Sequence, residues 1–174
     1  MKTDIPGNIV VVIRGEKHTY NIADLLEIDE NNLSKEFASQ AALFGFFATA
    51  QAEAEMEMEM ASSAKDREYA TADEYYRSEL ERKEKKYTEA VIRSSVIRDV
   101  DYVTAEQGFH IAEHNANMLK MIVKALGQRA EMLISLGAHL RAEADMTGMS
   151  IKTQANAAQE AREAILSKRK SGQV

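Results

Sequence analysis

The feature that most constrains this chain is a stretch from Leu33 to Met146 that contains no proline and repeats apolar residues at helical spacing. We predict that nearly all of it is helical, because proline is the residue that most reliably interrupts a helix. One straight helix of this length would extend over roughly 170 Å. A chain of 174 residues cannot cover such a rod with its own core, so we expect it to fold back or to oligomerise.

Four leucines recur at every seventh position of this stretch, and such a stripe needs a partner helix to cover it. With the leucines at heptad position d, the a positions, beginning at Ala116, carry short side chains that let two backbones approach closely. The predicted oligomerisation seam consists of Leu119, Val123, Leu126, Ala130, Leu133, Gly137 and Leu140. The alternative is an intramolecular helical hairpin, in which the same stripe packs against another helix of one chain.

The beginning of the chain differs from everything after it. Ile9–Ile13 is a run of β-branched residues, which is typical of a strand. Arg14–Lys17 can form a turn, and His18–Ile22 can return as a second strand. Because an isolated two-stranded hairpin is marginal in water, it packs on helices, pairs with another subunit, or is partly mobile. Ala23–Ile28 is predicted as one short helix.

The long helical stretch is expected to break in the middle. The best position is Ser62–Asp73, where Thr71–Glu74 has the pattern of a capping box that begins a new helix. A second kink is expected at Thr104–Gly108, and Gly148 is the expected C-terminal stop. The helix before the break is expected to bury one apolar face. That face consists of Leu33, Phe37, Ala41, Phe44, Ala48 and Ala52, and Leu43, Phe46 and Phe47 widen it, so we expect this helix to be buried on more than one side.

These patterns predict a mainly α fold, with long helices forming a hairpin or bundle and a small N-terminal β-hairpin. Residues 1–30 hold the hairpin and the short helix. Residues 31–148 form the long-helix region for oligomerisation and nucleic-acid binding. Residues 149–174 hold a last helix over Ser150–Leu166 and a basic tail.

Composition and motifs argue against an enzyme. Cysteine is absent, which excludes disulfides and thiolate metal sites. His110–His114 reads H-x-x-E-H and places two histidines on one helix face, but two surface histidines are the commoner explanation. Met56, Met58 and Met60 are explained by flexible packing rather than by soft-metal binding. We predict a non-enzymatic protein without metal or cofactor.

Targeting signals are not evident. The first residues, Met1–Pro6, lack the apolar core of a secretory signal. The most apolar run, Ala41–Ala50, is about half the length of a membrane-spanning helix. We therefore expect an intracellular protein that does not interact with membranes.

Charge is distributed unevenly along this acidic chain, whose net charge is −6. Between Glu53 and Glu74, eight acidic residues stand against two basic ones, whereas Arg77–Arg98 holds seven basic and four acidic residues. Cations beside aromatic rings are typical of a path for single-stranded nucleic acid, since the cation binds phosphate and the ring stacks on a base. The alternative is a solvated helix face with i, i+4 ion pairs such as Glu81 with Lys85.

The segment Leu33–Glu143 resembles UvsY-type recombination mediators of bacteriophages. The likeness is one of pattern: an alanine-rich helix with aromatic residues leads into a short basic junction that carries tyrosine, followed by Thr88–Ile92. The further matching residues are Val96, Val100 and Val103, then the closing block Met118–Glu143 with Ala130, Leu133 and Arg141. The resemblance covers about two thirds of the chain.

This resemblance implies a ring-like homo-oligomer in the cytoplasm of a bacterial host. It would bind single-stranded DNA and help a RecA-like recombinase to displace a single-strand-binding protein. The family's DNA-contacting stretch has a Lys-x-Arg pair followed by tyrosines, which Lys65–Arg67 and the tyrosines behind it match. The predicted DNA-binding residues are Lys65, Arg67, Tyr69, Tyr75, Tyr76, Arg77, Arg82, Lys83, Lys85 and Lys86. The alternative is a helical oligomeric scaffold or protein-interaction protein without DNA binding.

Overall fold

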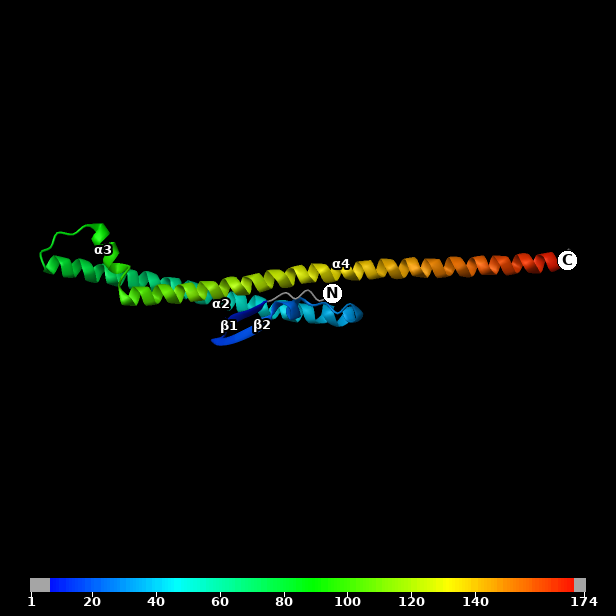
Figure 1. The fold of residues 1–174 in the computed structure, drawn as a ribbon, viewed down its shortest axis with the longest axis horizontal. Helices are drawn as coiled ribbons and strands as arrows, with labels where there is room; N and C mark the ends of the chain where they lie inside the picture. The colour runs from blue at the N-terminus through cyan, green and yellow to red at the C-terminus, as the bar shows by residue number, and fades with distance from the viewer. Residues whose placement is uncertain (1–6, 171–174) are drawn as a thin grey trace. The chain divides into compact units, whose positions relative to one another are not determined.

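The computed structural model describes the backbone of residues 7–170 and the side chains of residues 7–148 and of Gln159. Its elements are β1 (Asn8–Ile13), β2 (Glu16–Asn21), α1 (Ile22–Leu26), the 3₁₀ helix η1 (Glu30–Asn32), α2 (Leu33–Arg82), α3 (Glu89–Val96) and α4 (Val100–Lys170) (Figure 1). This confirms a mainly α fold with a small N-terminal β-hairpin. The chain divides into two compact units, and the boundary between them in the sequence falls between Arg129 and Ala130, within α4.

In the first unit, α2 and the beginning of α4 run antiparallel and side by side (Figure 1). Their pairing is visible at both ends of the contact. The Gln40 side-chain amide donates to the Leu126 carbonyl at 2.7 Å, and the rings of Tyr69 and Tyr102 meet edge to face at 5.7 Å. The chain therefore folds back on itself, which is one of the two outcomes that the length of the helical stretch requires.

The predicted break at Ser62–Asp73 is wrong, because α2 continues through it to Arg82. Ala72 inside the predicted break, and Tyr76 and Leu80 after it, pack with buried residues of α3, and this packing extends the helix. The end at Arg82 is a Schellman motif, in which the Lys85 amide donates to the Leu80 carbonyl at 3.0 Å. Glu84 takes the left-handed position of that motif, with φ of 54°, where glycine is usual.

The other predicted interruptions are also wrong, since α4 is continuous from Val100 to Lys170. At Thr104 the hydroxyl bonds back to the Val100 carbonyl at 2.7 Å, an arrangement that a helix tolerates. Gly148 lies within the helix, because one glycine costs only about 1 kcal/mol relative to alanine. The predicted last helix, Ser150–Leu166, is backbone of α4. Apart from that of Gln159, its side chains lie outside the described residues, as does the tail from residue 171.

The β-hairpin forms close to where its sequence predicts. The turn is shorter than expected, because Arg14 and Gly15 alone form it with φ of 52° and 81°, a two-residue turn that suits the strand twist. The second strand therefore begins at Glu16, which pairs with Ile13. Asn21 then caps α1 by accepting from the Ala23 amide at 2.9 Å.

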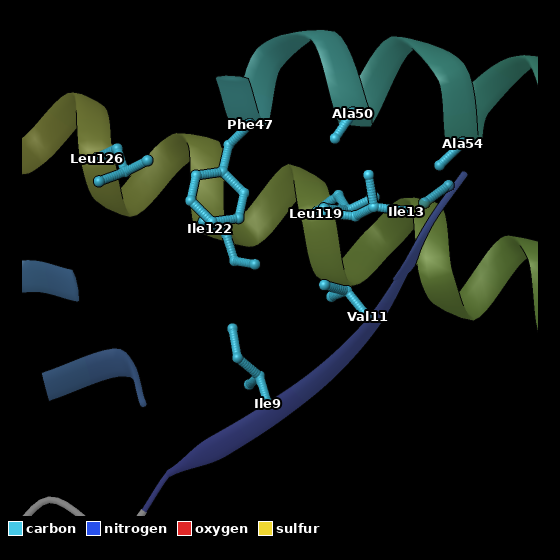
Figure 2. Close-up of a cluster of buried hydrophobic side chains, with 10 residues drawn as sticks. Ile9, Val11, Ile13, Phe47, Ala50, Ala54, Leu119, Ile122 and Leu126 are labelled. Carbon is cyan, nitrogen blue, oxygen red and sulfur yellow. The ribbon is translucent and has the colours of Figure 1, made fainter. Parts of the chain in front are cut away.

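The hairpin packs on the helices, and this contact forms the core of the first unit. Alternate residues of β1 point inward onto α2 and α4, as expected for a strand with one buried face (Figure 2). The buried apolar residues are Ile9, Val11, Ile13, Phe47, Ala50, Ala54, Ala116, Leu119, Ile122 and Leu126. Of the alternatives for the hairpin, packing on helices is the one observed.

The apolar face predicted for α2 is buried only in part, because Phe47 is buried and Leu43 packs against the core while most of the main stripe is exposed. Phe37 and Phe44 remain 44% and 41% exposed, whereas α2 buries Gln40, Phe47, Ala50, Ala54 and Ala72. The face is displaced because the hairpin contacts α2 as well: Tyr20 meets the ring of Phe47 edge to face at 5.2 Å. Sequence spacing cannot account for this second contact.

Asn115 on α4 binds the outer edge of β1 in the manner of a neighbouring strand. Its Oδ1 accepts from the Val12 amide at 2.7 Å, and its Nδ2 donates to the Val12 carbonyl at 2.9 Å. We expect Asn115→Ala to lower the free energy of unfolding by about 2 kcal/mol, because two backbone groups lose their partner. Urea unfolding measures the loss. Asn117→Ala, at an exposed position of the same helix, is the control, and an equal loss in both variants would contradict the assignment.

Candidate nucleic-acid interface

A hollow of about 460 Å³ lies between α2 and α3, and some of the predicted DNA-binding residues line it. It is lined by Tyr69, Ala70, Asp73, Arg77, Glu89 and Arg93. Two of these, Tyr69 and Arg77, are predicted DNA-binding residues. An aromatic ring and two guanidinium groups thus border one concave surface, which is the combination that a single strand requires.

The hollow exists because α3 packs on the end of α2. Ile92 and Val96, one turn apart on α3, are fully buried and contact Ala72 of α2. Four tyrosines surround this contact, together with Leu80. They are Tyr69, Tyr76, Tyr87 and Tyr102. The spacing of Ile92 and Val96 marks an amphipathic helix, so the same apolar pattern that forms α3 also positions the hollow.

Arg77 is bound by two carboxylates. Its Nε lies 2.6 Å from Asp73 on its own helix, and its Nη2 lies 2.5 Å from Glu89 at the beginning of α3. The hydrogen bond from Arg77 lowers the pKa of Glu89, and the bonds to Glu89 and Asp73 raise the pKa of Arg77. Glu89 is therefore ionised at neutral pH, and the positive charge of Arg77 is balanced locally.

The predicted tyrosines do not form one stacking surface. Tyr69 lines the hollow. The Tyr76 hydroxyl donates to Asp99 at 3.1 Å. The pKa of Tyr76 is raised, mainly by burial and secondly by this hydrogen bond. Tyr75 is exposed, but it borders a different hollow, of about 340 Å³, whose acidic residues are Glu68, Asp99 and Asp101. Of the predicted ring set, Tyr69 alone lies beside cations in the Arg77 hollow.

Several predicted cations already have partners. Lys65 lies 4.4 Å from the centre of the Phe109 ring. Arg82 and Lys83 both pair with Glu79, at 2.6 Å each, and the bond from Lys83 lowers the pKa of that carboxyl. Within the described residues, no carboxylate pairs with Arg67, Lys85 or Lys86, and all three are exposed.

Arg93 lines the hollow although it is missing from the predicted set. It is exposed, and no ion pair is found for it in the part of the chain that the structure describes. One signal could have found it: Glu89 and Arg93 stand four residues apart on α3, so they share the helix face that carries Glu89 toward Arg77.

The leucine stripe divides between core and surface. Leu119 and Leu126 are fully buried in the core that α2, α4 and β1 form within one chain, so for them the intramolecular alternative is the one observed. Leu133 is also buried, whereas Leu140 is 38% exposed. The remaining seam residues, Val123, Ala130 and Gly137, are half-buried.

The other motifs lie on the helix surface. His110 approaches Glu113 at 3.5 Å, and His114 is exposed. The described residues contain no cluster of three or more His, Cys, Asp or Glu that could hold a metal ion. Met58 packs against the core, while Met56 and Met60 are exposed. Among the described residues, every helix is too short in its apolar part or too polar to cross a membrane.

Comparison with known proteins gives no match. No family model, curated protein or solved structure matched this chain.

Proposed function

We propose that the protein is a non-enzymatic recombination mediator that binds single-stranded DNA as a homo-oligomer and helps a RecA-like recombinase to displace a single-strand-binding protein. The observation that carries the proposal is the hollow between α2 and α3, where the Tyr69 ring lies beside Arg77 and Arg93. Cation and ring together suit an unpaired strand, whose phosphates and bases are both accessible. The resemblance to UvsY-type mediators over Leu33–Glu143 supports the same function.

Assembly into a homo-oligomer is supported by apolar side chains that α2 leaves in solvent. The large ones are Phe37, Phe44, Phe46, Met56 and Met60. Large apolar side chains that one helix leaves in solvent are available to the surface of another subunit. Repetition would also compensate for a weak single site, because each subunit presents its own cations to the same strand. Weak, salt-dependent contacts would let the strand pass to the recombinase.

The exposed loop cations provide the test. We expect Lys85→Gln/Lys86→Gln to weaken binding of a single-stranded oligonucleotide about ten-fold at low salt and to reduce the slope of log affinity against log salt by about 1.4, since two phosphate contacts are lost. Fluorescence anisotropy at several salt concentrations measures both. Lys120→Gln/Lys124→Gln changes the charge equally at exposed positions of α4. Equal weakening by both pairs, or no binding by the wild type at low salt, would contradict the proposed interface.

The second candidate is a helical scaffold that binds proteins and no nucleic acid. It is favoured by the carboxylates that already pair with Arg77, Arg82 and Lys83. Native mass measurement combined with the same titration separates the two candidates. A defined oligomer that ignores DNA at low salt would support the scaffold, and a defined oligomer that binds DNA would support the mediator.

A further inference from the structure

In the Arg77 hollow, the Arg77 guanidinium already binds an internal carboxylate, that of Glu89. Glu89 accepts from Arg77 through both carboxylate oxygens, at 2.8 Å from Nη1 and 2.5 Å from Nη2. This two-bond geometry is also the one by which arginine binds a phosphate. An incoming phosphodiester and the Glu89 carboxylate would therefore compete for the same two N–H groups.

The two carboxylates on Arg77 are not equivalent. Asp73 precedes Arg77 by one turn of α2 and is 26% exposed, so it holds the guanidinium in place from the same rigid helix. Glu89 is 77% exposed and begins α3, which follows a loop after α2. An ion pair this open to solvent contributes little to stability. Glu89 can therefore leave Arg77 at small cost, whereas Asp73 keeps the guanidinium oriented.

The exchange balances charge, and a second cation is already present. A phosphodiester carries one negative charge, as the Glu89 carboxylate does, so Arg77 would stay neutralised after the replacement. Arg93 lines the same hollow without a carboxylate partner among the described side chains and stands one turn after Glu89 on α3. It can pair with the displaced Glu89 or with the phosphate itself, while the Tyr69 ring borders the position of the adjoining base.

We propose that this hollow is a phosphodiester-binding site that Glu89 holds closed, and that single-stranded DNA opens it by displacing Glu89 from Arg77. The inference rests on the proposed function, since it assigns a regulatory role to one acidic residue of that interface. It explains why an arginine in a concave, ring-bordered position has its charge balanced within the chain: the site binds only when phosphate outcompetes an internal carboxylate.

The test compares Glu89→Gln with Glu84→Gln. Both variants remove one negative charge, but Glu84 lies in the exposed loop between α2 and α3 and has no cation partner within the described residues. We expect Glu89→Gln to bind an oligothymidylate about five-fold more tightly than Glu84→Gln, because no carboxylate has to leave Arg77, and with the same salt slope, because the phosphate contact to Arg77 forms in both variants. Anisotropy titrations at low and moderate salt measure both quantities.

Two further variants trace the gain to the hollow. Arg77→Lys keeps the charge but cannot make two parallel bonds, so it should abolish most of the gain when combined with Glu89→Gln. Arg93→Gln, at an exposed position, should reduce the gain without affecting folding, and thermal unfolding of every variant checks this. A gain that persists in both backgrounds would overturn the proposal.

The outcomes separate the two levels of the argument. If the wild type binds DNA and the two glutamine variants behave alike, the closed site is wrong while the proposed function stands. If neither the wild type nor Glu89→Gln binds at low salt, both are wrong. Binding that appears only in Glu89→Gln would contradict the opening step, because single-stranded DNA would then fail to displace Glu89 from Arg77 in the wild type.

Discussion

Replacing Arg129 by alanine is expected to lower the free energy of unfolding by about 3–5 kcal/mol. The Glu36 carboxylate and the Gln40 side chain would then remain inside the protein without the cation that pairs with them. Arg129 is 5% exposed and joins three segments of the first unit. Its guanidinium donates to the Glu36 carboxylate, to the side-chain oxygen of Gln40 and, at 2.9 Å, to the Glu27 carbonyl. Urea unfolding monitored by circular dichroism measures the loss.

Two controls make this expectation specific. Gln128→Ala changes the adjacent exposed residue and should leave stability within about 0.5 kcal/mol. The double variant Arg129→Met/Glu36→Met removes both charges, so it should recover much of the loss, since an apolar pair of similar volume no longer strands a buried carboxylate. A double variant as unstable as Arg129→Ala would show that the arginine stabilises through packing and not through its charge.

Leu126→Ala is expected to cost about 3 kcal/mol, whereas Leu140→Ala should cost less than about 1 kcal/mol. The two leucines belong to the same heptad stripe, but Leu126 is fully buried and Leu140 is 38% exposed. Leu126 also borders an apolar cavity of about 160 Å³, which truncation would enlarge. Urea unfolding of both variants gives the comparison.

The same pair of variants tests which partner covers the stripe. The Leu126 contacts lie within one chain. The difference in free energy of unfolding between the wild type and Leu126→Ala should therefore stay the same over about a ten-fold range of protein concentration. A difference that grows on dilution would show that Leu126 also stabilises an association between subunits. Equal losses for Leu126→Ala and Leu140→Ala would contradict the burial difference itself.

Local sequence preferences account for the elements of this fold. The β-branched run Ile9–Ile13 and the Arg14–Gly15 turn specify a hairpin, because strand propensity and turn conformation depend on neighbouring residues. Helical spacing likewise predicts that almost all of the chain after Leu33 is helical. Helical spacing could not locate the point where the chain turns back. Helix α2 continues through the capping pattern at Thr71–Glu74 because side chains distant in sequence pack on Ala72.

The candidate site was also predictable from the sequence only in part. The sequence by itself determined that cations and tyrosines gather around the end of α2, since their positions along a helix follow from their order. Only the tertiary structure decided which of them are available: Arg77 is paired with Glu89, twelve residues away, and Arg93 joins Tyr69 in one hollow. The physical reason is range. Helix and strand formation are governed by neighbours, whereas burial and ion pairing depend on which helix faces meet after the chain has folded back.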